Sequence, residues 1–211
     1  MATTKMSITR ALNELTLLES RISRAISESV FTTHKKASSK NVLNGRKTVE
    51  EFSQEAKASL QSVQALIERR KQIKELIVAS NAVTKVTVGA KEYTVASAIE
   101  RKTSIQLDKM LLNKLVSSFA NSMSSVERAN EKLENEISML NTTYMAKENA
   151  MSETMLKMNQ EYREQNETTL VDPLNIQKLI ETMKNDIEEF ENEVDFVLSE
   201  SNSTHFIDIE D

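Results

Sequence analysis

The sequence predicts an all-α fold of long antiparallel helices and a coiled-coil hairpin, with one two-stranded β-hairpin inserted between helices. The 211 residues include only two glycines and one proline, so the chain has few places to turn. Apolar side chains recur at spacings of three and four over most of the length. Only residues 81–102 depart from that pattern in favour of strands.

Two amphipathic helices are expected in the first 80 residues. Ser7 is a suitable N-cap for a helix over about 7–30. Thr48 and Glu51 match a capping box that begins a second helix over about 48–80. Because the connection between them is short and polar, we expect an exposed loop joining an antiparallel pair.

The hairpin is predicted from residue type. Five of the six residues 83–88 are β-branched, which favours a strand over a helix. Gly89 and Ala90 supply the reversal, and residues 91–95 form the return strand. A two-stranded ribbon is marginal in water by itself. We therefore expect it to pack on a helix or to join strands of another copy, which suggests a homo-oligomer.

A third helix is expected over about 95–166, where glycine and proline are absent. At about 1.5 Å per residue it would exceed the diameter of a small domain. It therefore either projects as a coiled coil or breaks at a polar point, with 121–125 and 141–143 the weakest. Its near-heptad seam comprises Val126, Leu133, Ile137, Leu140, Tyr144, Met151, Met155, Met158 and Tyr162.

A fourth helix is expected to begin at Asp172 and Pro173, with the acid as its cap, and to fold back on residues 130–166. The predicted organisation has three parts. They are a helical core over 1–120 with the β-hairpin at about 83–95, a coiled-coil hairpin over 121–200, and a mobile acidic tail over 201–211.

Charge is distributed unevenly along the chain. Residues 1–110 hold 19 basic and 11 acidic residues, whereas residues 111–211 hold eight basic and 21 acidic residues. This asymmetry suggests either an anion-facing half or head-to-tail and antiparallel pairing between copies. The alternative is that both halves are ordinary solvated helix faces.

Composition disfavours several classes of function. There is no cysteine, and the two histidines, His34 and His205, fall in a predicted loop and the predicted tail. We therefore expect no catalytic residue, no metal site, no cofactor and no enzyme. No signal peptide or run of about 20 apolar residues is present, so a cytoplasmic protein without a membrane role is expected. The net charge of −5 and the few aromatic residues disfavour extended nucleic acid.

Basic residues crowd the hairpin and its flanks. If the three segments meet, they form an anion pocket, in which arginine would contact phosphate and Tyr93 would stack on a nucleoside. The alternative is that Arg69 and Arg70 only complement a helix dipole. The candidate ligand-binding residues are Arg69, Arg70, Lys74, Asn81, Thr84, Lys85, Tyr93, Arg101 and Lys102.

Within residues 67–110, the order RRKQIKELI followed by SNAVTKVTVGAKEYTVASAIERK resembles the septicolysin-like family of small helical proteins of bacteria and their phages. The resemblance covers no other part of the chain. It implies a helix, a short hairpin and a basic helix start, and no established catalytic activity. A phage or prophage origin is in keeping with it.

Two functional hypotheses follow. The first is a non-enzymatic, phage- or prophage-encoded binding protein that sequesters a phosphate-bearing nucleotide or a host protein, with a possible anti-defence role. The alternative is a structural or scaffolding component of a phage particle, in which the charge asymmetry orders neighbouring copies.

Overall fold

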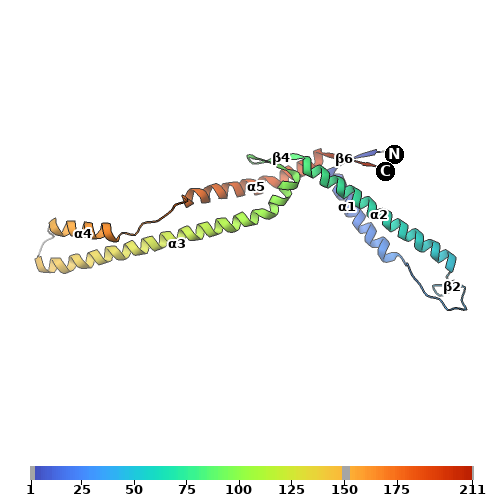
Figure 1. Cartoon of the computed structure of the whole chain (residues 1–211), viewed down its shortest axis with the longest axis horizontal. Helices are drawn as coiled ribbons and strands as arrows, with labels where there is room; N and C mark the ends of the chain where they lie inside the picture. Colours follow the sequence, from blue (N-terminus) through green and yellow to red (C-terminus); the bar gives the residue numbers. More distant parts are fainter. Residues whose placement is uncertain (1–2, 149–152, 211) are drawn as a thin grey trace. The chain divides into compact units, whose positions relative to one another are not determined.

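The computed structural model describes residues 3–148 and 153–210, and it confirms the all-α fold (Figure 1). The helices are α1 (Ile8–Glu28), α2 (Val49–Val83), α3 (Val95–Glu148), α4 (Glu153–Asn166) and α5 (Ile176–Thr204). Three antiparallel strand pairs accompany them: β1 (Thr3–Ser7) with β6 (Phe206–Glu210), β2 (Asn41–Val42) with β3 (Lys47–Thr48), and β4 (Lys85–Val88) with β5 (Lys91–Thr94).

The chain divides into two compact units, which differ from the predicted division at residues 120 and 200. Unit 1 consists of Met1–Lys102 and Phe190–Asp211, and unit 2 consists of Thr103–Glu189. The C-terminal residues thus belong with the N-terminal helices. In the described part of the chain, no helix has the length and apolarity needed to cross a bilayer.

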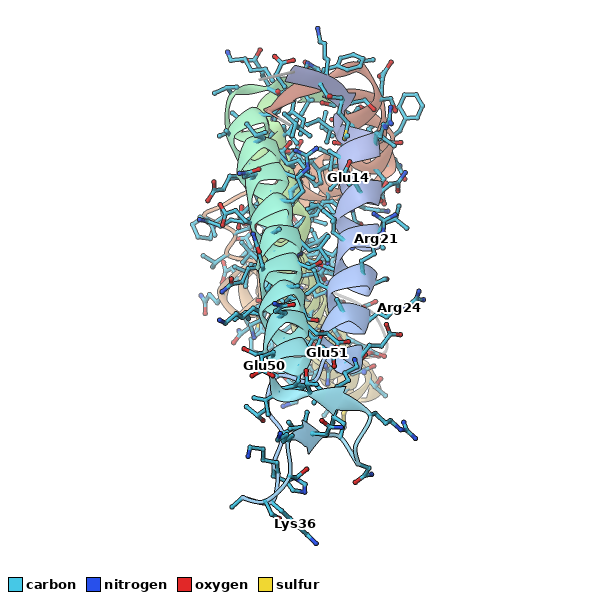
Figure 2. The ribbon with its side chains drawn as sticks, turned by 90° about the vertical axis from the view of Figure 1, so that its right-hand side faces the viewer. Glu14, Arg21, Arg24, Lys36, Glu50 and Glu51 are labelled. Atoms are coloured by element: carbon cyan, nitrogen blue, oxygen red, sulfur yellow. The ribbon has the colours of Figure 1, made fainter. Side chains whose placement is uncertain are left out.

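Helices α1 and α2 form the predicted antiparallel pair and lie side by side in unit 1 (Figure 2). Ser7 Oγ accepts a hydrogen bond from the Arg10 N–H at 3.4 Å, which confirms it as the N-cap of α1. The capping box is also confirmed. Thr48 Oγ1 accepts from the Glu51 N–H at 3.2 Å, and Glu51 Oε2 accepts from the Thr48 N–H at 2.8 Å.

The last residues do not form the predicted mobile tail. Residues 206–210 form β6, which pairs along its length with β1, with Met6 opposite Ile207 and Thr4 opposite Ile209. Ile207 and Ile209 point into the core between α1 and α2, because alternate residues of a strand face the same side. This core comprises Met6, Ile8, Ala11, Leu15, Leu18, Ile73, Ile77, Ile207 and Ile209.

The predicted hairpin is confirmed as β4 and β5, with Lys85 opposite Thr94 and Val88 opposite Lys91. Val86 and Val88 are buried on one face of the ribbon. Gly89, at the reversal, has a φ of +59°, a conformation that suits glycine because it has no Cβ. The ribbon therefore packs on the rest of unit 1, which was one of the two expected arrangements.

The expected helix over 95–166 is two helices, and its weakest points were wrongly predicted. Helix α3 continues through both polar stretches to Glu148, and α4 begins at Glu153. Helix α4 runs antiparallel to α3, because Asn159 bonds to Asn141 while Arg163 bonds to Glu134.

Of the predicted seam, Leu133, Ile137 and Met155 are buried and Val126 is half-buried. Met151 lies outside the described residues. The other predicted seam residues are exposed, because the partner covers only part of the stripe: Leu140, Tyr144, Met158 and Tyr162.

Helix α5 begins later than predicted. Asp172 carboxylate oxygens accept from the Leu174 N–H at 3.2 Å and from the Ile176 N–H at 2.8 Å, so Asp172 still caps the helix start. Asn175, with a φ of +51°, separates Pro173 from the helix. The C-terminal half of α5 bonds to the hairpin and to the start of α3 instead of to residues 130–166, where α4 pairs with α3.

Candidate functional site

The base and tip of the β4–β5 hairpin are fixed by backbone hydrogen bonds. The Val95 N–H donates to the Thr84 carbonyl at 2.9 Å, where α3 begins. At the tip, the Gly89 N–H donates to Glu193 Oε2 of α5 at 2.7 Å. Helix α5 therefore positions the hairpin through the carboxylate of Glu193.

Two of the predicted site residues meet on one aromatic ring. Tyr93 makes an edge-to-face contact with Phe190, with ring centroids 5.7 Å apart. The Arg101 guanidinium carbon lies 5.8 Å from the centroid of the same ring, within the range of a cation–π interaction. Since Phe190 is buried, these contacts fasten α3 and the hairpin to α5.

Two further cations of the predicted cluster are paired with carboxylates. Lys85 Nζ lies 2.8 Å from Glu92 Oε1 across the ribbon, and this hydrogen bond raises the pKa of the Lys85 ammonium. Lys102 forms an ion pair with Asp195 of α5. A bound phosphate would have to compete with both carboxylates.

Arg69 and Arg70 lie away from the hairpin, at about 20 Å along α2 from its C-terminal end at the rise of an α-helix. Arg69 Nε lies 3.5 Å from Glu14 Oε1, and Arg70 Nε donates to Glu19 Oε1 at 3.1 Å. These pairs join α2 to α1. The alternative of a helix-dipole role is wrong for these two arginines, because they lie far from the last turn of α2 and pair with carboxylates of α1 instead.

The structure brings together four of the nine predicted residues, namely Lys85, Tyr93, Arg101 and Lys102, on and beside the hairpin. Thr84 adds only its backbone, Asn81 is half-buried in the last turns of α2, and Lys74 is exposed farther back on α2. None of the nine lines any of the five best-formed cavities in the described part of the chain. Their role in ligand binding stays a prediction.

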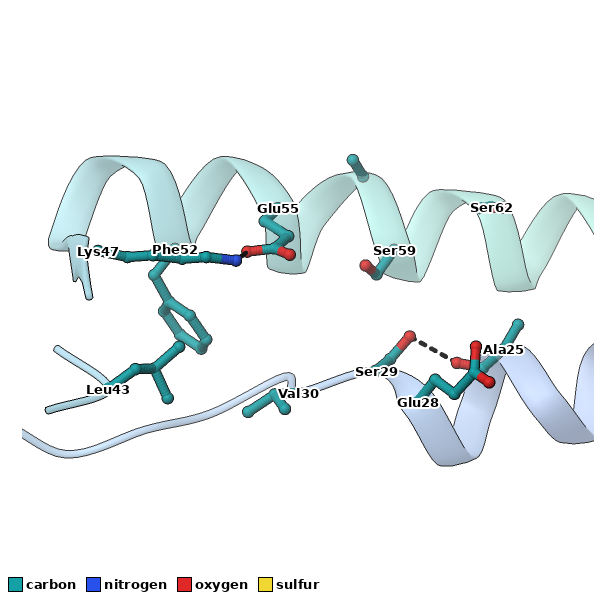
Figure 3. A pocket seen from close by; sticks show the side chains of 11 residues that line it. Ala25, Glu28, Ser29, Val30, Leu43, Lys47, Phe52, Glu55, Ser59 and Ser62 are labelled. Carbon is teal, nitrogen blue, oxygen red and sulfur yellow. Dashed lines mark hydrogen bonds and ion pairs between the residues drawn. The ribbon is translucent and has the colours of Figure 1, made fainter.

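The largest of these cavities, about 480 Å³, lies in unit 1 between the end of α1, the start of α2 and the β2–β3 turn (Figure 3). Phe52 and Leu43 point toward each other at one end, and Lys47 forms an ion pair with Glu55 along one wall. Its lining contains no histidine beside a hydroxyl, which a nucleophilic site would need. The lining residues are Ala25, Glu28, Ser29, Val30, Leu43, Lys47, Phe52, Glu55, Ala58, Ser59 and Ser62.

The histidines belong to no metal cluster. His205 lies at the end of α5, where its Nδ1 is 3.0 Å from the Ser201 carbonyl, and His34 is exposed in the α1–α2 loop. Within the described ranges, no group of three or more His, Asp or Glu side chains could hold a metal ion.

The charge asymmetry of the sequence is largely balanced inside unit 1. Residues 1–102 hold 18 basic and ten acidic residues, and residues 190–211 add seven acidic residues and no basic one, so this unit has a net charge of +1. Residues 103–189 hold nine basic and 15 acidic residues, so unit 2 has a net charge of −6. Within unit 1, the ion pair of Lys102 with Asp195 joins the basic and acidic halves of the sequence.

Unit 2 displays an apolar surface that the predicted site did not include. Among its described side chains, five apolar ones are buried and 14 large apolar ones are exposed. Leu107, Met110 and Leu111 are 68%, 68% and 50% exposed. At spacings of three and four, they share one face of α3. We call these three residues the apolar cluster; the methionine-rich composition of the third helix was the signal that could have found such a surface.

No protein-family model, curated protein or solved structure matches this chain. The resemblance of residues 67–110 to the septicolysin-like family stays a prediction.

Proposed function

We propose that this chain is a non-enzymatic helical assembly protein, which works by binding protein surfaces and, in the first place, other copies of itself. The observation that carries the proposal is the excess of exposed over buried apolar side chains in unit 2. Exposed apolar patches of this kind mark interaction surfaces in soluble proteins. A partner helix that covers such a face removes its apolar side chains from water, which is favourable and which the single chain does not achieve.

The apolar cluster is the part of this surface that we assign to the contact. Its three side chains are spaced as the anchors of a helix-in-groove or helix-on-helix contact are spaced. Methionine adapts its shape to different neighbours, so Met110 suits a surface that packs against a second helix.

The contacts of the basic residues favour a nucleotide ligand less than a protein partner. Glu92 and Asp195 already accept from Lys85 and Lys102, and Arg69 and Arg70 pair with α1. A phosphate would have to displace carboxylates at each of these positions. Sequestration of a nucleotide, a phage origin and an anti-defence role therefore stay predictions from the sequence.

The test is the mass of the full chain in solution at high salt, where contacts between exposed charges are screened. We expect a multiple of the chain mass for the natural sequence in light scattering. The triple variant Leu107→Gln, Met110→Gln, Leu111→Gln should shift to the mass of one chain with unchanged helix content. The control variant Val171→Gln, Leu174→Gln changes exposed apolar residues outside the helices and should keep the natural mass.

A single-chain mass at every concentration would overturn the proposal, as would an oligomer that survives the triple substitution. Growth into large assemblies with rising concentration would favour the structural or scaffolding role. A small closed oligomer at all concentrations would favour binding of a separate protein.

A further inference from the structure

The loop at the far end of the α1–α2 pair is a cationic surface. Residues 29–46 hold four cations, Lys35, Lys36, Lys40 and Arg46, and no carboxylate. No acidic group in the described part of the chain lies within ion-pair distance of Lys36, Lys40 or Arg46. Figure 2 shows Lys36 extending from the end of the loop. We call residues 29–46 the basic tip.

The basic tip also carries apolar side chains. Val30 is 52% exposed and Phe31 is 40% exposed, a few residues before the first lysines. A surface with both cations and an exposed aromatic ring suits a partner that has carboxylates around an apolar centre.

One face of α5 in unit 1 has that complementary composition. Phe196 is 71% exposed, and Glu200 follows it by four residues on the same helix face. Glu193 precedes Phe196 by three residues, and its carboxylate also accepts a hydrogen bond from the Gly89 N–H of the hairpin. The part of α5 over residues 190–204 contains four carboxylates and no lysine or arginine. We call Glu193, Phe196 and Glu200 the Phe196 face.

The two surfaces of one chain lie too far apart within unit 1 to meet. Leu198 and Ser199 of α5 share a cavity with Leu12, in the second turn of α1, whereas the basic tip follows the end of α1 at Glu28. Sixteen helical residues separate Leu12 from Glu28, which is about 24 Å. This distance is several times the Debye length of about 8 Å at physiological salt.

We propose that the basic tip of one copy docks on the Phe196 face of a second copy. The charges of the two surfaces are complementary in sign and each surface supplies an exposed aromatic ring, so one contact explains both features. Because the two surfaces differ, the contact is heterologous and joins copies head to tail in a ring or an open chain. It deepens the assembly role and rests on the function proposed above, but it uses residues of unit 1 and depends on salt.

The test is a charge swap followed by analytical ultracentrifugation of the full chain. The tip variant is Lys36→Glu, Lys40→Glu, and the face variant is Glu200→Lys. Each should abolish the species that the natural chain forms at low salt and loses at high salt, or raise the concentration it needs by about tenfold or more. An equimolar mixture of the two variants places Glu on the tip of one and Lys on the face of the other, and should restore a paired species.

Phe196→Ser should weaken the same species without any change in charge. The control variant Lys114→Glu, Lys178→Glu has the same total charge as the tip variant and reverses two exposed lysines elsewhere. It should leave the salt-sensitive species unchanged.

The proposal is overturned if the natural chain forms no salt-sensitive species, or if the mixture of tip and face variants fails to pair. It is also overturned if low salt compacts the chain at constant mass, which would indicate a contact within one chain. If the charge swap fails while the natural chain still forms an oligomer at high salt, only the contact between the basic tip and the Phe196 face is overturned. If the natural chain forms no oligomer at high salt, the proposed function is overturned instead.

Discussion

Arg163 of α4 meets Glu134 of α3 in a bidentate ion pair, with Nε–Oε1 and Nη2–Oε2 distances of 2.7 Å each. The planar guanidinium fork matches the two carboxylate oxygens, so the pair fixes orientation as well as distance. The hydrogen bonds from Arg163 lower the pKa of the Glu134 carboxyl, and the same bonds raise the pKa of the guanidinium. Both groups are exposed to water, which limits the contribution of the pair to stability.

A pH titration of stability should detect this pair. The pKa of Glu134 is lower in the folded chain than its ordinary value of 4.5, so its stabilising effect is fully present above pH 4.5. That effect is lost as the pH falls through the folded pKa. Glu134→Gln should therefore lower the unfolding free energy at neutral pH, and the difference from the natural chain should vanish in acid.

Chemical denaturation of both proteins over a range of pH measures this difference. Glu131→Gln, a change at an exposed position one turn earlier on α3, serves as the control for lost negative charge. A difference between the natural chain and the Glu134→Gln variant that stays constant into acid would contradict the assignment.

At the scale of an element, the start of α2 is a reciprocal capping box between Thr48 and Glu51. The Thr48 N–H and hydroxyl both donate to the Glu51 carboxylate, and these bonds lower the pKa of that carboxyl. The cap matters because α2 follows directly on β3, which ends at Thr48. It sets the position at which the chain leaves the β2–β3 turn and enters the helix.

Thr48→Ala should destabilise the first turn of α2 by about 1 kcal/mol, because one backbone N–H loses its acceptor. Thr48→Ser keeps the hydroxyl and should recover most of the loss. Hydrogen exchange at the first amides of α2 measures the effect, with the amides near Ile73 as the internal reference. Equal protection in the Thr48→Ala and Thr48→Ser variants would show that the hydroxyl does not cap the helix.

Local signals were sufficient for some elements and not for others. Caps, helical periodicity and β-branched runs act within a few residues, so the sequence predicted α1, α2 and the β4–β5 hairpin well. Strand β6 was missed because its five residues pair with a segment at the other end of the chain, which leaves no local signature. The antiparallel pairing of α4 with α3 was also missed, since neither glycine nor proline occurs in the sequence between residues 95 and 166.

The candidate site was predictable only in part, because the groups that contact its cations come from a distant segment of the sequence. Sequence spacing placed Lys85, Arg101 and Lys102 near the hairpin, but it could not reveal Phe190 and Asp195 as partners on α5 for the last two. A cation that looks free in sequence can be paired from any distant segment. Asp195, in the acidic C-terminal part of the chain, pairs with Lys102 in this way.

At the scale of the whole molecule, the two ends of the described chain close the core of unit 1. Ile209 of β6 is 1% exposed, and it belongs to the same core cluster as Ile8 of α1 and Ile73 of α2. Phe206, on the same strand, is 52% exposed, and its ring centroid lies 5.4 Å from the Lys5 ammonium. Within one strand, Ile209 thus contributes to the core and Phe206 makes a surface contact, so substitutions at the two positions compare these contributions.

Ile209→Ala should destabilise unit 1 by about 2–5 kcal/mol, because it leaves a cavity among residues that cannot close over it. Phe206→Ala, the matched control, removes a larger side chain from the surface and should cost far less. Hydrogen exchange across the full chain measures both: α1 amides should open sooner in the Ile209→Ala variant, whereas α4 amides in unit 2 should keep their protection. If Ile209→Ala leaves α1 exchange unchanged, β6 does not hold the core together, and residues 206–210 behave as the tail that the sequence predicts.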